Sequence, residues 1–202
     1  MQTELNASVL ADLQHEAERM HASFSDAYQV QVEAERALGG AASVRSGLVK
    51  RLDATRRALS EAKQKAISAA VADVDFEESA AQVAAIRNEA EISERALHYY
   101  HSHAYQDAVC QSLTSKLNAL EAQHRSEVLR LEHIEAKIQL EISAVAGRNG
   151  GSLEIQMGSG TAGHRDLCNR IRRIADAARL ELERAIAEGR ALRDAYELKE
   201  QL

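Results

Sequence analysis

The stretch from Ser79 to Val145 contains neither glycine nor proline, and it constrains the fold more than any other part of the chain. Apolar residues recur along it at steps of three and four, the spacing that places side chains on one face of an α-helix. These residues are Val83, Ile86, Ala90, Leu97, Tyr100, Ala104, Leu113, Leu117, Leu120, Val128, Leu131, Ile134, Ile138, Ile142 and Val145. An unbroken helix here would be about 100 Å long, several times the usual length. We therefore expect one long central helix over residues 79–147.

This central segment has one weak place, the sequence HYYHSHAYQD at residues 98–107. Histidine, tyrosine, serine and aspartate are poor helix formers, and three of the five tyrosines lie here. One interpretation is that the helix bends or breaks within the segment. The other is that the tyrosines fill a junction at which another helix ends. The sequence leaves both open.

Two helical segments, residues 4–38 and 41–73, are expected before the central helix. The first is acidic, with seven Asp and Glu against two Arg, and the second is basic, with seven Lys and Arg against three Asp and Glu. Gly39-Gly40 between them suits the left-handed turn that ends a helix. The sequence therefore predicts an antiparallel hairpin whose arms attract each other. The Asp-x-x-Glu pattern that begins at Asp75 predicts a capping box where the next helix starts.

Glycines mark the last boundary, because residues 147–163 hold six of the ten in the chain. We expect a Gly-rich loop at 148–163 with a short strand in which Leu153, Ile155 and Met157 alternate. A C-terminal helix over 164–202 would pack back on a helical domain formed by residues 1–147. The expected fold is all-α, an elongated antiparallel helical bundle or coiled coil. More apolar surface would be exposed than one chain covers, which predicts a homodimer or a higher assembly.

The composition supports a thin helical core, because there is no Pro or Trp and only 3% of residues are aromatic. The net charge of −6 argues against nucleic acid or an anionic membrane as the main partner. Two cysteines, Cys110 and Cys168, are too few for a disulfide framework. No signal-peptide core and no run of about 18 apolar residues is present. We therefore expect a soluble, cytoplasmic protein with reduced thiols.

The sequence GSGTAG at residues 158–163 fits the G-x-G-x-x-G pattern of dinucleotide-binding folds, but no βαβ unit surrounds it. A flexible linker is the preferred interpretation, and a small anion site formed by the helix start and Arg165 is the alternative. About twenty residues around this pattern are similar to a stretch of bacterial peptide-chain release factors. The Gly-Gly-Gln tripeptide that such factors need is absent, so no function is inferred from the resemblance.

Two Glu-x-x-His pairs, Glu18/His21 and Glu121/His124, have the spacing of carboxylate and imidazole ligands in di-iron four-helix bundles. A metal site in a four-helix bundle is therefore an alternative function, although a structural histidine is the plainer interpretation of His124. The cluster of His98, His101 and His103 is likewise interpreted as hydrophilic packing beside the tyrosines. No metal or other cofactor is expected.

Arg165, Arg172 and Arg179 repeat every seven residues, which places them along one edge of the last helix. Ion pairs with a neighbouring helix are the preferred interpretation, and a docking surface for an acidic partner is the alternative.

No catalytic Ser-His-Asp or Cys-His arrangement is recognisable, so the sequence predicts a non-enzymatic scaffold or adaptor that self-associates and binds other proteins. Its candidate binding residues are Leu153, Ile155, Met157, Arg165, Arg172 and Arg179. A lipid- or nucleic-acid-binding module that uses the basic segment 41–73 is a weaker alternative.

Overall fold

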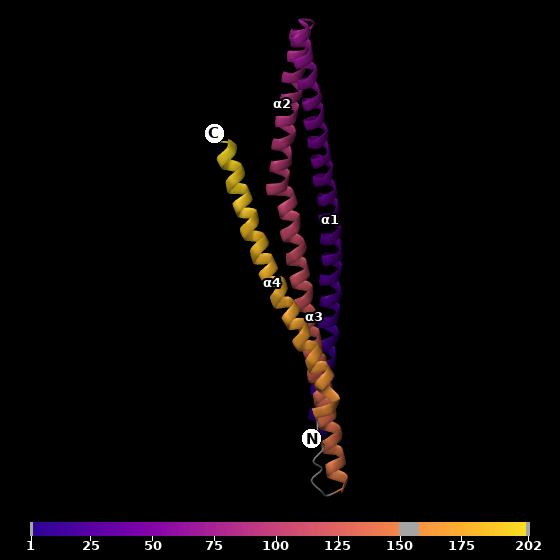
Figure 1. Ribbon diagram of the computed structural model, residues 1–202. Helices are drawn as coiled ribbons and strands as arrows, with labels where there is room; N and C mark the ends of the chain where they lie inside the picture. Colours follow the sequence, from indigo (N-terminus) through magenta and orange to yellow (C-terminus); the bar gives the residue numbers. More distant parts are fainter. Residues whose placement is uncertain (1, 150–157, 201–202) are drawn as a thin grey trace. The chain divides into compact units, whose positions relative to one another are not determined.

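A computed structural model describes residues 2–149 and 158–200 and shows an all-α helical bundle (Figure 1). The helices are α1 (Gln2–Ala72), α2 (Phe76–Tyr100), the π-helical segment η1 (His101–Tyr105), α3 (Gln106–Asn149) and α4 (Gly158–Glu200). Apart from the turn at residues 73–75, every residue in these two ranges is helical. The predicted fold class is confirmed. None of the described helices is both long and apolar enough to cross a membrane.

The chain divides into two units by its internal contacts. Unit 1 comprises Met1–Ala34 and Gln111–Glu183, and unit 2 comprises Glu35–Cys110 and Arg184–Leu202. Helices α1, α3 and α4 each contribute residues to both units.

Helix α1 runs through Gly39-Gly40 without interruption, so the predicted hairpin of residues 4–38 and 41–73 is wrong. Buried and half-buried residues follow one another along α1 at alternating steps of three and four, and the pattern does not change phase at the glycines. The residues of this stripe are Leu10, Leu13, Ala17, Met20, Phe24, Ala27, Gln31, Ala34, Leu38, Ala41, Arg45, Leu48, Leu52, Thr55, Leu59, Ala62, Ala66 and Ala69, and Val32 and Ala58 are half-buried beside it. The glycines lie on the exposed side, where each costs only about 1 kcal/mol relative to alanine. Burial of the continuous stripe outweighs that cost.

The hairpin turn lies instead at residues 73–75, between α1 and α2, within the region where the sequence predicts the start of the next helix (Figure 1). Asp73 adopts a left-handed backbone with φ of 54°, and the Val74 amide donates a 3.2 Å hydrogen bond to the Ala69 carbonyl. This is the Schellman arrangement, with aspartate at the position that glycine usually occupies. The predicted capping box is not formed, because Asp75 is also left-handed and its side chain caps no amide.

In unit 2, α1 and α2 run antiparallel and are linked by two ion pairs. Arg51 lies 3.4 Å from Glu89, and Arg56 lies 3.3 Å from Glu94. The basic part of α1 therefore takes its carboxylate partners from α2. The sequence analysis assigned these partners to residues 4–38, which belong to the same helix and cannot fold back on it.

In unit 1, α3 and α4 run antiparallel. Leu117 packs against Ala175 and Ala178 in a small core, flanked by Leu120 and Leu182. Ion pairs border this core at Lys116–Glu181 and Arg179–Glu121, with distances of 3.5 and 2.7 Å. The buried residues of α4 are small or medium-sized, which allows its backbone to approach α3 closely.

Helix α4 begins at Gly158, six residues before the predicted start at 164. Gly158, Gly160 and Gly163 are therefore helical, which corrects the predicted loop over that part of 148–163. Thr161, in the first turn of α4, is only 2% exposed. Burial of this residue favours a helical first turn over a flexible linker. The predicted strand residues Leu153, Ile155 and Met157 lie outside the described residues.

We predict that replacing Gly39 and Gly40 by alanine stabilises the protein by about 1 kcal/mol per site, because both are helical and a Cβ at either would meet nothing within 4 Å. Urea unfolding followed by circular dichroism measures this change. The reverse substitution at the exposed neighbour, Ala42→Gly, should destabilise by a similar amount. Destabilisation by Gly39→Ala would show that the helix ends there in a left-handed turn.

Candidate functional site at the π-helical turn

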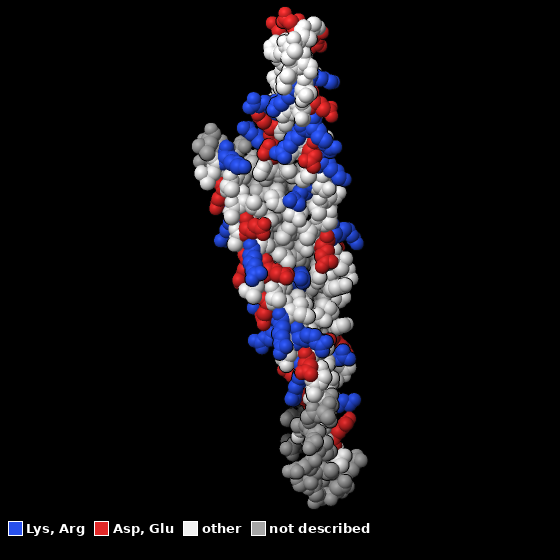
Figure 2. Space-filling model, in the orientation of Figure 1, with Lys and Arg blue, Asp and Glu red and all other residues white. Residues whose placement is uncertain are grey.

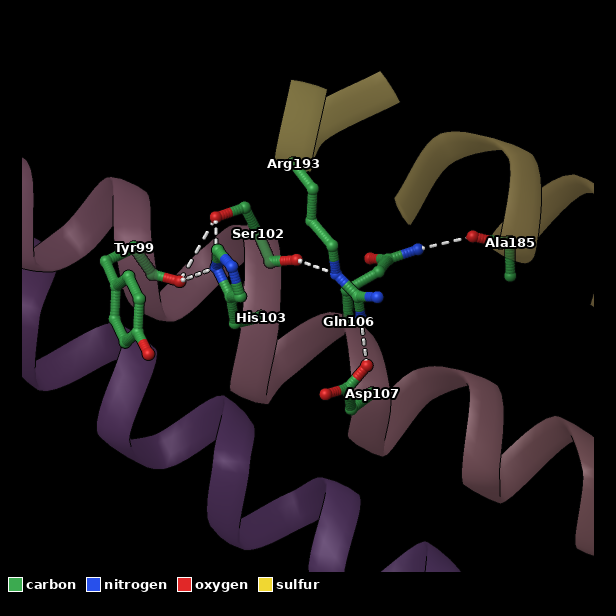
Figure 3. A network of polar contacts seen from close by, with 7 residues as sticks. All are labelled: Tyr99, Ser102, His103, Gln106, Asp107, Ala185 and Arg193. Carbon is green, nitrogen blue, oxygen red and sulfur yellow. Dashed lines mark hydrogen bonds and ion pairs between the residues drawn. The ribbon is translucent and has the colours of Figure 1, made fainter. Parts of the chain in front are cut away.

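The densest group of polar contacts in unit 2 surrounds η1, where the end of α4 meets the junction of α2 and α3 (Figure 3). This is the place where the sequence predicts a bend, a break or a tyrosine-filled junction. The helix does not break, since Tyr100, His101 and Gln106 all keep right-handed helical dihedrals. It widens by one π turn, and Tyr99 meets Tyr196 near the end of α4.

The π turn lets Tyr100 and Tyr105 contact the same neighbouring helix. The Tyr100 hydroxyl donates a 3.3 Å hydrogen bond to the Ala41 carbonyl of α1, and the Arg45 guanidinium of α1 lies 5.2 Å from the centre of the Tyr105 ring. Residues five apart lie far around an α-helix, but i and i+5 are brought together in a π-helix. The π turn also shifts which residues face the neighbouring helix. Ala104, which was predicted to lie on the apolar stripe, is exposed.

Arg193 of α4 is held between Ser102 and Asp107 (Figure 3). Its Nε donates a 3.2 Å hydrogen bond to the Ser102 carbonyl, and its guanidinium also bonds to the Asp107 carboxylate. A π turn interrupts the regular ladder of backbone hydrogen bonds, which leaves carbonyls free to accept from side chains. Arginine satisfies the backbone carbonyl and the carboxylate at once.

Gln106 forms the second polar link to α4. Its side-chain amide donates a 2.7 Å hydrogen bond to the Ala185 carbonyl, and the residue is only 4% exposed. One turn further along α4, a Cβ added at Gly189 would lie 2.7 Å from Gln106 Cγ. The glycine therefore permits the close approach that this buried hydrogen bond requires.

Aromatic contacts lie beside these polar links. Tyr99 stacks on His103 with ring centres 4.5 Å apart, and Tyr196 of α4 packs edge-on against both rings. Ser102 Oγ lies 2.8 Å from His103 Nδ1 and 2.9 Å from the His98 carbonyl. The predicted cluster of His98, His101 and His103 is thus hydrophilic packing beside tyrosines, as the sequence analysis preferred.

His101 lies partly buried near Arg45 and Glu188, and this environment shifts its pKa. Burial lowers its pKa below the ordinary value of 6.5, and the positive charge of Arg45 lowers it further, while Glu188 acts in the opposite direction. Its Nδ1 atom is buried and makes no hydrogen bond among the described residues. The folded protein therefore favours the neutral imidazole.

Together, Ser102, Gln106, Asp107, Gly189 and Arg193 form a clasp that holds the end of α4 against the junction of α2 and α3. These five residues were not predicted as a set from the sequence. The available signal was the isolated Gly189 inside a strongly helical segment, together with the unusual composition of residues 98–107. Which side chains the clasp joins could not be deduced without the pairing of the helices.

The four predicted metal ligands do not converge. Glu18 and His21 line a groove of about 590 Å³ between α1 and α3, whereas Glu121 and His124 line a separate cavity of about 300 Å³ between α3 and α4. The second cavity also contains Arg172 and Arg179, whose positive charges disfavour a cation. No group of three or more metal-ligating side chains occurs among the residues that the structure describes.

The heptad arginines have mixed surroundings. Arg165 Nε donates a 3.0 Å hydrogen bond to Glu135, and Arg179 pairs with Glu121, so both form the interhelical contacts that the sequence analysis preferred. Arg165 is therefore engaged at the helix start where an anion site was considered. Arg172 is exposed and has no ion pair within the described residues.

The two thiols have little nucleophilic character. Burial raises the pKa of both Cys110 and Cys168, and a neighbouring carboxylate, Asp107 or Glu127 respectively, raises it further. Because the thiolate is the reactive form, neither cysteine has the environment of a catalytic nucleophile.

We predict that Gly189→Ala destabilises the protein by about 1–2 kcal/mol, because the new methyl group displaces Gln106 and breaks its buried hydrogen bond to the Ala185 carbonyl. Thermal unfolding measures the loss. Gly163→Ala is the matched control, since it lies in the same helix and its Cβ would meet nothing within 4 Å. Adding Gln106→Ala to Gly189→Ala should give a smaller loss than the sum of the single changes. Strict additivity would contradict the proposed contact.

We also predict that His101 reduces stability in acid. Since the pKa of the folded state lies below the unfolded value of 6.5, the unfolded chain binds this proton more tightly, and stability falls as the pH drops below about 6.5. Urea midpoints at pH 7 and pH 5 should differ less for His101→Gln than for the natural protein. His15→Gln, which changes an imidazole that is 79% exposed, serves as the control. An unchanged pH dependence in His101→Gln would rule out this effect.

No protein-family model, curated protein or solved structure gives a significant match to this chain. All-helical bundles carry many unrelated functions, so the fold alone does not select one. Two features bear on function: the clasp at the π turn and the exposed apolar residues at the end of the α1–α2 hairpin.

Proposed function

We propose that this protein is a non-enzymatic helical scaffold or adaptor that works through protein–protein contacts and self-association. The observation that carries the proposal is the cluster of exposed apolar side chains at the end of the α1–α2 hairpin. Val71 is 85% exposed, Ile67 63%, Val74 57% and Phe76 51%. Large apolar residues gathered on a protein surface commonly mark an interaction site.

Contacts between the two helices of the hairpin hold this surface in place. The pairs Arg51–Glu89 and Arg56–Glu94 link its two arms, and Leu52, Ala62 and Ala90 are buried along them. Such a pair of helices presents its end at a fixed distance from its base, which suits a protein that positions partners.

The clasp at the π turn supports a structural role for the polar residues of unit 2. Arg193 and Gln106 both donate to backbone carbonyls of another helix, and Asp107 is occupied by Arg193. Groups that are engaged in this way hold helices together. Their arrangement favours a scaffold over a catalyst, whose reactive groups need access to a substrate.

We predict that a photo-crosslinking amino acid placed at Val71 in the native cells captures a defined protein, because this side chain is the most exposed of the apolar cluster. Mass spectrometry of the crosslinked bands identifies the captured chain. The same amino acid at Ile92, which is 58% exposed but lies along the arm of the hairpin, is the matched control.

Capture at position 71 should be lost when Phe76 is changed to Asn, because this change removes an apolar neighbour without altering the charge. Capture of the same proteins from both positions, or from neither, would contradict the assignment of a binding surface to the end of the hairpin.

A further inference from the structure

We propose that the end of the α1–α2 hairpin in one copy docks on an arginine-bearing face of α4 in a second copy. This inference rests on the proposed scaffold function and names the partner of its binding surface. The hairpin tip is residues 71–78, and the arginine patch consists of Arg170, Arg173, Ile174, Ala177 and Leu180.

The hairpin tip combines apolar and acidic side chains. All eight of its residues are exposed, and its four carboxylates are Asp73, Asp75, Glu77 and Glu78. No lysine or arginine occurs between Lys65 and Arg87 to balance them. Figure 2 shows this end of the hairpin as white and red, with blue beginning only farther along the arms. None of the four carboxylates has an ion-pair partner in the part of the chain that the structure describes.

The arginine patch has the opposite charge and a similar apolar content. Arg170, Arg173, Ile174 and Ala177 are separated by three, one and three residues, which places them on one face of α4. Ile174 is 47% exposed and Leu180 is 55% exposed. No ion pair within the described ranges involves either arginine of the patch, in contrast to Arg165 and Arg179 on the neighbouring face.

These two surfaces complement each other in charge and in apolar character. Four negative charges on the tip would face two positive charges on the patch, and Val71 and Phe76 could pack against Ile174 and Leu180. Contact of a tip with a tip would bring eight carboxylates together, and contact of two patches would oppose arginines. Electrostatics therefore selects tip-to-patch contact, which is heterologous, and every copy carries both halves of it.

The strength of this contact should depend strongly on salt. Both surfaces are solvent-exposed, and interactions between exposed charges are weakened as the Debye length falls from about 10 Å at 0.1 M salt to a few ångströms at 1 M. We expect the weight-average mass in sedimentation equilibrium to rise above 22.1 kDa with concentration at 50 mM salt. The rise should be much smaller at 500 mM salt.

Charge exchange tests the pairing directly. A tip variant, Glu77→Lys/Glu78→Lys, changes the tip from four negative charges to a net charge of zero, because Asp73 and Asp75 balance the two lysines. A patch variant, Arg170→Glu/Arg173→Glu, carries negative charge on both surfaces. Each variant alone should lose self-association by at least about tenfold. An equimolar mixture of the two should associate again, because the unchanged tip of the patch variant then meets the unchanged patch of the tip variant. The variant with all four changes should stay dissociated, because its neutral tip is not attracted to its negative patch.

The control Asp53→Lys/Glu61→Lys makes the same change in net charge as the tip variant but lies along an arm of the hairpin. It should associate like the natural protein, and circular dichroism should show that all variants keep their helical content. A second tip variant, Val71→Asn, should weaken association without changing any charge.

The outcomes separate this inference from the proposed function. A protein that self-associates but shows no recovery in the mixture would overturn tip-to-patch docking and leave a scaffold that assembles through another surface. A protein that is monomeric at every concentration would overturn self-association itself. Crosslinking of a different protein at position 71 would then still support an adaptor, whereas absence of any crosslink would remove both proposals.

Discussion

Burial of one continuous stripe on each long helix is the constraint on which the structure depends. With a core built mainly from alanine, serine and leucine, each contact contributes little, so stability must come from many contacts repeated along the helices. A helix in this bundle is therefore tied to the phase of its stripe. A shift of the stripe around the helix is tolerated only where the backbone can change its local helical geometry, as in a π turn.

The same constraint explains why two apparent helix-breaking signals have different outcomes. Gly39 and Gly40 fall on the exposed side of α1, and because the stripe keeps its phase across them, the helix continues. At residues 101–105 the chain must place both Tyr100 and Tyr105 against α1, although they are five residues apart. The helix resolves this difference by widening into a π turn. The carbonyl of Ser102 is then bonded by Arg193, so that the local departure from α-helical geometry becomes an attachment point for α4.

The charged residues are arranged differently between paired helices and on the exposed surfaces. Along the paired helices, carboxylates and arginines lie opposite one another, as in Arg56–Glu94 and Arg179–Glu121. At the hairpin tip and on the arginine patch, by contrast, charges of one sign accompany exposed apolar residues. Exposed apolar residues and unpaired charges contribute little to the stability of the folded monomer. For this reason we propose that these two surfaces, rather than the clasp, bind a partner.

The sequence by itself determined the helical class, the long central helical run and the place of its irregularity. These follow from apolar spacing, absence of proline and local composition, which are properties of short stretches. It did not determine whether Gly39-Gly40 ends a helix, where α4 begins, or that Gln106 needs Gly189 opposite it. Only the tertiary structure decided these points. A glycine costs a helix only about 1 kcal/mol, and this local free energy is outweighed by the burial of side chains against the neighbouring helix.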